Sequence, residues 1–291
     1  MRLSNVLFLV LFLGAAWVQA EEEVRYKPYV LASTSADSVK TNLQAQGFKV
    51  VGEYESDANV KVIVVTNEEL KTTAAQSTTN GGFGAIMRVA ITNGVVSYTN
   101  PPYWANAYRM KTELGGVVTA LKKALGNNGE FGSEYGMSQN ELRQYYYAPF
   151  MPYFDETVEL ETYPTYQKCT ETVEAGLKSE EGAKAQTQFV YRVNIPNKKE
   201  TVFGMAVFGE SEGTDTNVMT TLNESTGKPE HTAYMPYEIL CSDTKALILP
   251  AKFRIAISFP ELKMWPFMMI RGAPDGIKEA AKAAAQLIKN N

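Results

Sequence analysis

Residues 85–99 read AIMRVAITNGVVSYT, and this stretch decides the fold class. Two runs rich in β-branched residues flank Asn93-Gly94, a dipeptide typical of a two-residue hairpin turn. A third run, Val60–Thr66 (VKVIVVT), has the composition of a strand that is buried on both faces. Strands joined by hairpins lie antiparallel, so the sequence predicts a largely antiparallel sheet with helices packed on one face.

The rest of the first half alternates predicted strands and helices around this hairpin. Ser35 is the expected N-cap of a helix, and Gly47 ends that helix because glycine adopts positive φ without strain. Asn67 is the expected cap of a second helix. The expected order is β-α-β-β-α-β-β-α, with strands near 24–33, 48–54, 60–66, 85–92 and 95–99 and a closing helix near 116–125.

The second half repeats this order. Strands are expected at 157–162, 186–195, 201–208, 237–241 and 253–259, and helices at 165–177, 216–222 and 275–288. Val96–Pro101 and Ile255–Pro260 each read as a strand that ends in proline, and a tryptophan follows each of them. We therefore predict an α+β fold of two similar modules, at residues 21–126 and 155–291.

Residues 127–154 separate the two predicted modules and are rich in aromatic residues. Tyr145-Tyr146-Tyr147 and Phe150–Phe154 make this segment too aromatic for a free tether. We interpret it as a linker or docking segment whose rings pack the two modules together.

The N-terminus, residues 1–20, has the layout of a cleaved secretory signal. Arg2 precedes an apolar run from Val6 to Val18, and Val18-Gln19-Ala20 places suitable residues at the two positions that a signal peptidase reads. The run is too short to span a membrane, which takes roughly 20 apolar residues. We predict cleavage after Ala20 and a periplasmic or secreted protein with no membrane span in the mature chain.

The charge balance limits the classes of partner. The chain has 28 Lys and Arg residues against 32 Asp and Glu residues, a formal charge of −4. This acidic excess favours solubility and disfavours nucleic acid or anionic lipid as a partner. The expected partner is a small molecule or a protein, and an exposed sheet edge would also allow a homodimer.

The two cysteines, Cys169 and Cys241, have two interpretations. In an oxidising compartment a disulfide bond is the first. The alternative is a pair of separate buried thiols, which pack as small hydrophobic groups. We favour the disulfide, which would close a loop of about 70 residues.

Several motifs resemble one bacterial family. They are Gly47–Val51 (GFKVV), Val62–Asn67 (VIVVTN), Gly94–Pro101 (GVVSYTNP) and Ala246–Pro250 (ALILP). Their order resembles that of the uncharacterised domain-of-unknown-function family numbered 302, over about residues 24–125 and 155–290. The resemblance implies a small α+β fold and supplies no catalytic residues. Ala251 stands where members of that family commonly carry a cysteine.

Patterns for catalysis or metal binding are weak. His231, the one histidine, lies in the polar sequence KPEHT and is expected on the surface, and no Gly-x-Ser-x-Gly elbow accompanies it. One histidine and two cysteines match no zinc spacing. Met264, Met268 and Met269 could offer thioethers to Cu(I), but methionines beside aromatic residues are more often core filler. We predict no metal and no cofactor, and we assign no catalytic residue.

One segment is the best candidate for a ligand site. It follows a rigid Pro101-Pro102 pair and combines rings, amides and a guanidinium, the parts from which small-ligand pockets are built. The predicted ligand-binding residues are Asn100, Tyr103, Trp104, Asn106, Tyr108 and Arg109. The same residues could instead cover a sheet edge or the junction of the modules, and this packing role is the one we favour.

Two functions from different classes remain open, beside a purely structural role. The first is a non-enzymatic exported protein that binds a ligand or partner at this aromatic segment. The second is an exported enzyme of unrecognised type that uses carboxylates or tyrosines in a cleft between the modules. An ionisable pair with displaced pKa values in that cleft would favour the enzyme, and a groove of rings and amides would favour binding.

Overall fold

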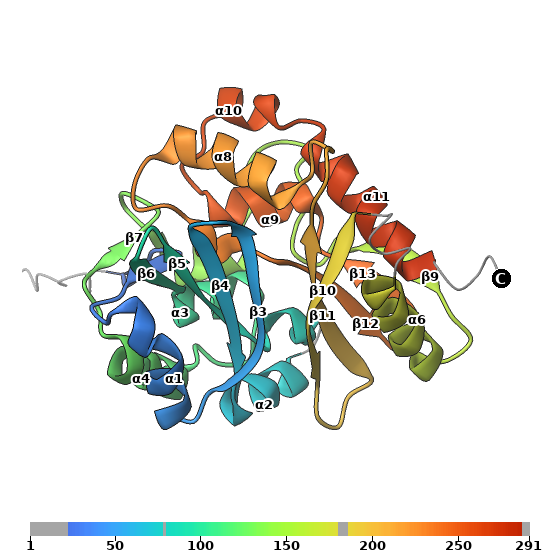
Figure 1. The fold of residues 1–291 in the computed structure, drawn as a ribbon, viewed down its shortest axis with the longest axis horizontal. Helices are drawn as coiled ribbons and strands as arrows, with labels where there is room; N and C mark the ends of the chain where they lie inside the picture. Colours follow the sequence, from blue (N-terminus) through green and yellow to red (C-terminus); the bar gives the residue numbers. More distant parts are fainter. Residues whose placement is uncertain (1–22, 78–79, 180–185, 287–291) are drawn as a thin grey trace, which may run out of the picture.

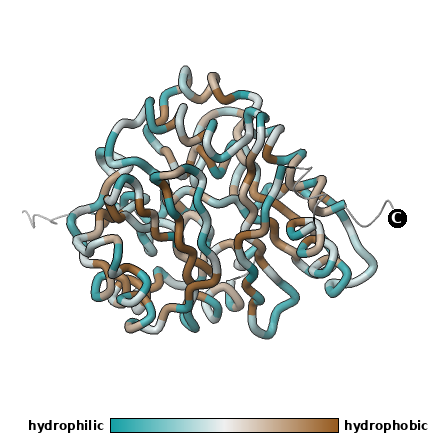
Figure 2. Tube along the Cα trace, viewed as in Figure 1, coloured by the Kyte–Doolittle hydropathy of each residue, from teal (hydrophilic) through white to brown (hydrophobic). Residues whose placement is uncertain are grey.

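The computed structural model of the chain describes residues 23–77, 80–179 and 186–286 (Figure 1). Its fold is α+β with antiparallel sheets, as the sequence predicts. Hydrophobic residues are concentrated along the strands of both halves (Figure 2). The predicted signal peptide, residues 1–20, lies outside the described residues.

The first half of the chain forms a six-stranded sheet. Its strands are β2 (Tyr29–Leu31), β3 (Lys49–Asp57), β4 (Val60–Thr66), β5 (Met87–Thr92), β6 (Val95–Thr99) and β7 (Glu130–Phe131), in the spatial order β3-β4-β5-β6-β2-β7. Its helical segments are η1 (Ala36–Ser38), α1 (Val39–Ala45), α2 (Glu68–Gln76), η2 (Gly81–Gly84), α3 (Pro101–Ala107) and α4 (Gly115–Leu125). The predicted hairpin between β5 and β6 is confirmed, and both of its turn residues, Asn93 and Gly94, have positive φ.

The second half forms a five-stranded sheet. Its strands are β9 (Val158–Thr162), β10 (Thr187–Asn194), β11 (Glu200–Val207), β12 (Tyr237–Ser242) and β13 (Lys245–Ile248), in the spatial order β10-β11-β12-β13-β9. Its helical segments are α6 (Tyr166–Lys178), α8 (Asp215–Thr226), η3 (Thr232–Tyr234), α9 (Ala251–Ser258), α10 (Met264–Met269) and α11 (Ala273–Gln286). Between the halves lie β8 (Met137–Ser138), which pairs with β1 (Arg25–Tyr26), and α5 (Gln139–Arg143).

The two halves share one topology. Each has the order β-α-β-β-α-β-β followed by helices, and each large sheet places the first strand of its half beside the last. Helices α1 and α4 pack together in the first half, and α6 and α11 do so in the second. The repeated order that the sequence predicts is therefore present, with one further helix, α3 or α9, before the closing helices.

One predicted strand, at residues 253–259, is wrong. Residues 253–258 belong to helix α9, Phe259 is its C-cap, and the fifth strand of the second sheet is β13. Residues 253–259 are buried on every side, so their hydrophobicity has no period that distinguishes a helix from a strand. The counterpart of the Val96–Pro101 motif is therefore the strand and proline at Lys245–Pro250, rather than Ile255–Pro260.

The edge strands β3 and β10, which hold equivalent places in the two sheets, lie against each other. Each carries a bulge, between Val50 and Gly52 in β3 and at Val190 in β10. A Cβ atom on Gly52 would lie 2.4 Å from the carbonyl oxygen of Val190. Only glycine allows the two backbones to approach this closely.

Short helical segments cross the junction in both directions. Segment η2 of the first half packs on β11 and β12 of the second, and η3 of the second half packs on β4, β5 and β6 of the first. In Figure 1 the turn between β3 and β4 points up beside α8, while the turn between β10 and β11 points down beside α2. The two halves therefore use equivalent short segments and turns on the two sides of their junction.

A buried ion pair lies at this junction. Arg88 and Glu238 are the second residues of the equivalent strands β5 and β12, and their side chains pair across the two halves. Arg254 of α9 lies 3.5 Å from the same carboxylate, and its guanidinium stands 5.1 Å from the Trp104 ring centre. All three charged side chains are 1–2% exposed, so two guanidinium groups share one carboxylate in the interior.

Aromatic rings of the segment between the halves contact both of them. Phe154 stacks on Tyr108 of the first half, with ring centres 5.3 Å apart, and lies 6.0 Å from Phe253 of α9. Tyr145 also packs edge-on against Phe253. Tyr147 stacks on Phe267 of α10 and donates a hydrogen bond to the carbonyl oxygen of Leu262.

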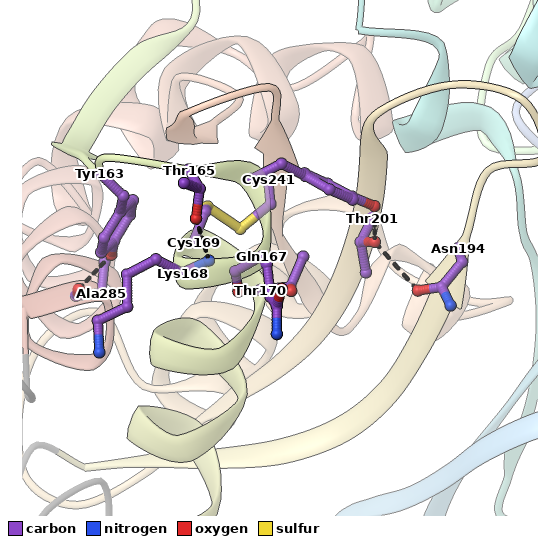
Figure 3. The surroundings of a disulfide bond; sticks show 11 residues. Tyr163, Thr165, Gln167, Lys168, Cys169, Thr170, Asn194, Thr201, Cys241 and Ala285 are labelled. Atoms are coloured by element: carbon purple, nitrogen blue, oxygen red, sulfur yellow. Dashed lines mark hydrogen bonds between the residues drawn. A yellow bond between two sulfur atoms is a disulfide. The ribbon is translucent and has the colours of Figure 1, made fainter.

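The predicted disulfide between Cys169 and Cys241 is confirmed (Figure 3). It joins helix α6 to strand β12, and the two cysteines are 72 residues apart in the sequence. Both cysteines are fully buried. Thr165, the N-cap of α6, accepts a hydrogen bond from the backbone of Lys168 next to the bridge.

Candidate functional site

The predicted ligand-binding segment forms helix α3 at the junction of the two halves. Five of its predicted residues are 0–3% exposed, and Arg109 is partly exposed; the five are Asn100, Tyr103, Trp104, Asn106 and Tyr108. Of these residues, Asn100 lines a small cavity of about 160 Å³ next to α4. Ligand binding at this segment stays a prediction.

Most polar groups of this segment are bonded to the protein itself, whereas the Tyr108 hydroxyl is buried without a hydrogen-bond partner among the described residues. The Tyr103 hydroxyl donates to the carbonyl oxygen of Ile257 in α9 at 2.7 Å, which ties the first half to the second. The Trp104 ring N–H donates to the Pro28 carbonyl at 2.8 Å, and the Asn100 amide donates to that of Lys27. Arg109 pairs with Asp155 at 2.9 Å. These contacts are those of a packing element, the role that we favoured for this segment.

A larger cavity lies at the junction, on the side of α8. It has a volume of about 500 Å³, and we call it the junction groove. Its lining comes from both halves: Ser56, Asp57 and Val60 around the β3–β4 turn, Thr216, Met219, Thr220, Asn223 and Glu224 of α8, and Gly227, Lys228, Glu230, Thr232 and Met235 of the segment that follows α8. The volume lies within the range of small-ligand pockets.

Two further cavities border the segment that follows α8. One, of about 370 Å³, extends past Lys228 and Pro229 to His231, and the other, of about 360 Å³, lies over the β5–β6 turn. Lys228 lines all three cavities. Its neighbour Glu230 accepts a hydrogen bond from the Asn223 amide at 3.2 Å, which fixes this segment to α8.

In the described part of the chain, bonds between the halves bridge the equivalent junction on the opposite side. There the turn between β10 and β11 faces α2, and the Lys198 ammonium donates to the Ser77 carbonyl at 2.9 Å. Lys198 also pairs with Glu200 at 3.0 Å, and Glu200 accepts the Gly82 backbone N–H. A side chain on Gly82 would collide with Leu240. The two junctions, built from equivalent elements, thus differ in the described residues: bonds between the halves bridge one, and the other holds the groove.

The charges of the junction groove are mainly negative. Asp57, Glu224 and Glu230 supply carboxylates to its lining, and Lys228 supplies an ammonium group. Val60, Met219 and Met235 supply apolar surface. The groove therefore suits a small polar ligand that also presents apolar atoms.

A carboxyl–phenol pair lies behind the wall of the groove. Asp215 is the first residue of α8, is 3% exposed, and accepts a 2.6 Å hydrogen bond from the Tyr54 hydroxyl of β3. It also accepts the Val207 backbone N–H at 3.1 Å. Burial raises the pKa of the Asp215 carboxyl to about 7 and that of the Tyr54 phenol well above its usual value. Sequence reasoning missed this pair, because Asp215 has the signature of an ordinary first-turn acidic residue.

The prediction that His231 lies on the surface is wrong. The side chain is buried, its ring stacks on Phe259 with centres 4.8 Å apart, and Tyr29 lies at 5.0 Å. Its Nδ1 lies 3.2 Å from the Ser258 carbonyl oxygen, which only accepts, so Nδ1 carries the proton. Burial lowers the pKa of His231 to about 4. The ring is therefore neutral at physiological pH.

The methionines considered for Cu(I) are not core residues. Met264, Met268 and Met269 lie on α10 and are 48–63% exposed, so the expectation that they fill the core is wrong. Among the residues that the structure describes, no cluster of three or more His, Cys, Asp or Glu side chains could hold a metal ion.

Comparisons with known proteins identify no relative. No protein-family model, curated protein or solved structure matches the chain. The resemblance to the domain-of-unknown-function family numbered 302 therefore stays a prediction. Within the described ranges, no helix has the length and apolar character that crossing a membrane requires.

Proposed function

We propose that this chain is an exported binding protein that takes a small polar molecule in the junction groove. The observation that carries the proposal is the difference between the two junctions in the described residues: the one beside α8 has a cavity of about 500 Å³, whereas Lys198 and Glu200 bridge the two halves at its counterpart. A disulfide-bonded fold supports a location outside the cytosol. The predicted secretory signal at residues 1–20 fits the same location.

The wall of the groove includes both halves, so a bound ligand would stabilise their association. The carboxylates of Asp57, Glu224 and Glu230 favour a ligand with hydrogen-bond donors or a cationic group. Lys228 lines all three cavities, and its ammonium group would meet an acceptor of the ligand.

Mass spectrometry of the natively purified protein tests the proposal. We expect a retained small molecule, seen as a mass excess under native conditions that disappears on denaturation. Thr220→Trp places a large ring in the groove from an exposed position of α8 and should abolish the excess. Asn217→Trp adds the same ring at an exposed position of α8 outside the groove lining and should retain it. Equal retention by both variants would refute the groove as the binding site.

The alternative is an exported enzyme, and one observation favours it. Asp215 and Tyr54 form an ionisable pair with raised pKa values beside a cleft between the halves. In this case Asp215 would serve as a proton donor or acceptor near neutral pH. Turnover of a bound molecule that is lost in Asp215→Asn, while binding persists, would select the enzyme.

A further inference from the structure

Helix α10 is an addition to the repeated fold. In the first half, residues 108–114 connect α3 to α4 without a helix, whereas the equivalent connection from α9 to α11 contains α10. Helix α10 stands at the top of the molecule in Figure 1, above α8, which it contacts. Because the first half has no such helix, the shared topology does not account for the sequence of α10.

The outward face of α10 is apolar. Phe267 is 8% exposed and anchors the helix by stacking on Tyr147. The residues that face outward are Met264 (53% exposed), Trp265 (75%), Met268 (48%) and Met269 (63%). A surface helix normally presents polar residues to water, so this pattern is reversed. A continuous exposed apolar patch marks a surface that meets a partner or a membrane.

Two cations flank this face. Lys263 precedes the first residue of α10, and Arg271 follows two residues after its last. Both are exposed, and neither forms a salt bridge with the part of the chain that the structure describes. The nearby carboxylate of Glu261 is occupied, because it accepts hydrogen bonds from Ser133 and Glu134. The border of the apolar face carries both signs, because the carboxylate of Glu261 lies near Lys263 in the chain and that of Glu212 lies against Gly272, next to Arg271.

The size of the patch distinguishes between the classes of partner. A helix that binds in a protein groove uses anchors at i, i+3 or i+4, and i+7, and the six residues of α10 do not reach i+7. A stable dimer buries about 800 Å² on each partner, which four side chains on fewer than two turns do not supply. A lipid surface makes no such demand on area, because interfacial segments bury only their apolar side chains, to a depth of about 5–10 Å.

We propose that α10 docks the protein on a phospholipid surface. Trp265 and the three methionines enter the boundary between headgroups and acyl chains, where tryptophan is enriched in membrane proteins. Lys263 and Arg271 meet the lipid phosphates. The protein then lies on the membrane without spanning it.

Fluorescence of Trp265 tests this proposal directly. The chain has three tryptophans; Trp17 lies in the predicted leader and Trp104 is 2% exposed, so in protein that begins at Glu21 a spectral shift on lipid addition reports on Trp265. Vesicles of phosphatidylcholine, alone or with one quarter phosphatidylglycerol, serve as the probe. We expect co-sedimentation, a blue shift and quenching by lipids brominated on the acyl chain.

Variants separate α10 from other exposed rings. Trp265→Ala should weaken vesicle binding by about tenfold, because a large apolar side chain no longer leaves water. Tyr135→Ala removes another ring that is 74% exposed and should leave binding unchanged. Absence of binding to both vesicle types, or equal binding by wild type and Trp265→Ala, would overturn the proposal. A dimer in lipid-free solution that Trp265→Ala dissociates would overturn it as well, in favour of a second copy of the chain.

Discussion

Asp215→Asn measures how much the burial of one carboxyl group costs this fold. Burial raises the pKa of Asp215 from 3.8 to about 7. Between these two values the folded protein holds a proton that the unfolded chain has lost, so stability falls as pH rises from about 4 to about 7 and stays lower above that range. A difference of about three pKa units corresponds to about 4 kcal/mol.

The asparagine variant removes this pH dependence. Its amide oxygen still accepts the hydrogen bonds of Tyr54 and Val207, and it carries no charge at any pH. We expect the free energy of unfolding of the variant, minus that of wild type, to rise by about 4 kcal/mol between pH 4 and pH 8. Changes in the other titrating groups cancel in this difference.

Urea denaturation of the disulfide-bonded protein, followed by far-ultraviolet circular dichroism at several pH values, measures the difference. Asp243→Asn provides the control, because the Asp243 side chain is 68% exposed and lies in a turn with positive φ that asparagine also accepts. The control shows what the loss of an exposed carboxyl group does in the same assay, and we expect a smaller change than for Asp215→Asn. A flat result for Asp215→Asn would show that the carboxyl group is ionised in the folded protein and would refute the reasoning.

Three further predictions concern the junction and the bridge. Burial lowers the pKa of His231 from 6.5 to about 4, so the unfolded chain takes up a proton at a higher pH than the folded protein, and wild type loses stability as the pH falls. In the same assay, the free energy of unfolding of His231→Phe minus that of wild type should rise by about 3 kcal/mol from pH 7 to pH 4. Glu238→Gln leaves two buried arginines without their carboxylate and should cost about 3–5 kcal/mol, with a loss below 1 kcal/mol arguing against the ion cluster. Replacing Cys169 and Cys241 together by serine should cost about 4 kcal/mol in urea denaturation, and thiol labelling of unfolded wild type should find no free cysteine.

Strands and turns of this fold are readable from local sequence. The Asn93-Gly94 hairpin and the Asn67 cap, whose side chain accepts the Leu70 backbone N–H at 2.9 Å, depend on contacts within a few residues. The repeated order of elements follows from the same signals. Residues 253–259 were predicted as a strand in error, because they are buried on all sides. The spacing of hydrophobic residues distinguishes a helix from a strand only where one face of the element meets water.

The candidate site depends on contacts that sequence reasoning could not supply. His231 lies in a polar stretch, and it is buried because Tyr29 and Phe131 of the first half close over it. Asp215 and Tyr54 are 161 residues apart and meet only when the halves associate. The predicted segment at α3 had the right composition for a pocket, but its rings are used to hold the halves together.

The opposite charges of Arg88 and Glu238 decide which halves can associate. If two copies of the first half met in this geometry, arginine would face arginine at the centre, without the Glu238 carboxylate between them. Burying like charges against each other costs several kcal/mol. The Arg88–Glu238 pair therefore favours the association of unlike halves over that of the first half with a copy of itself.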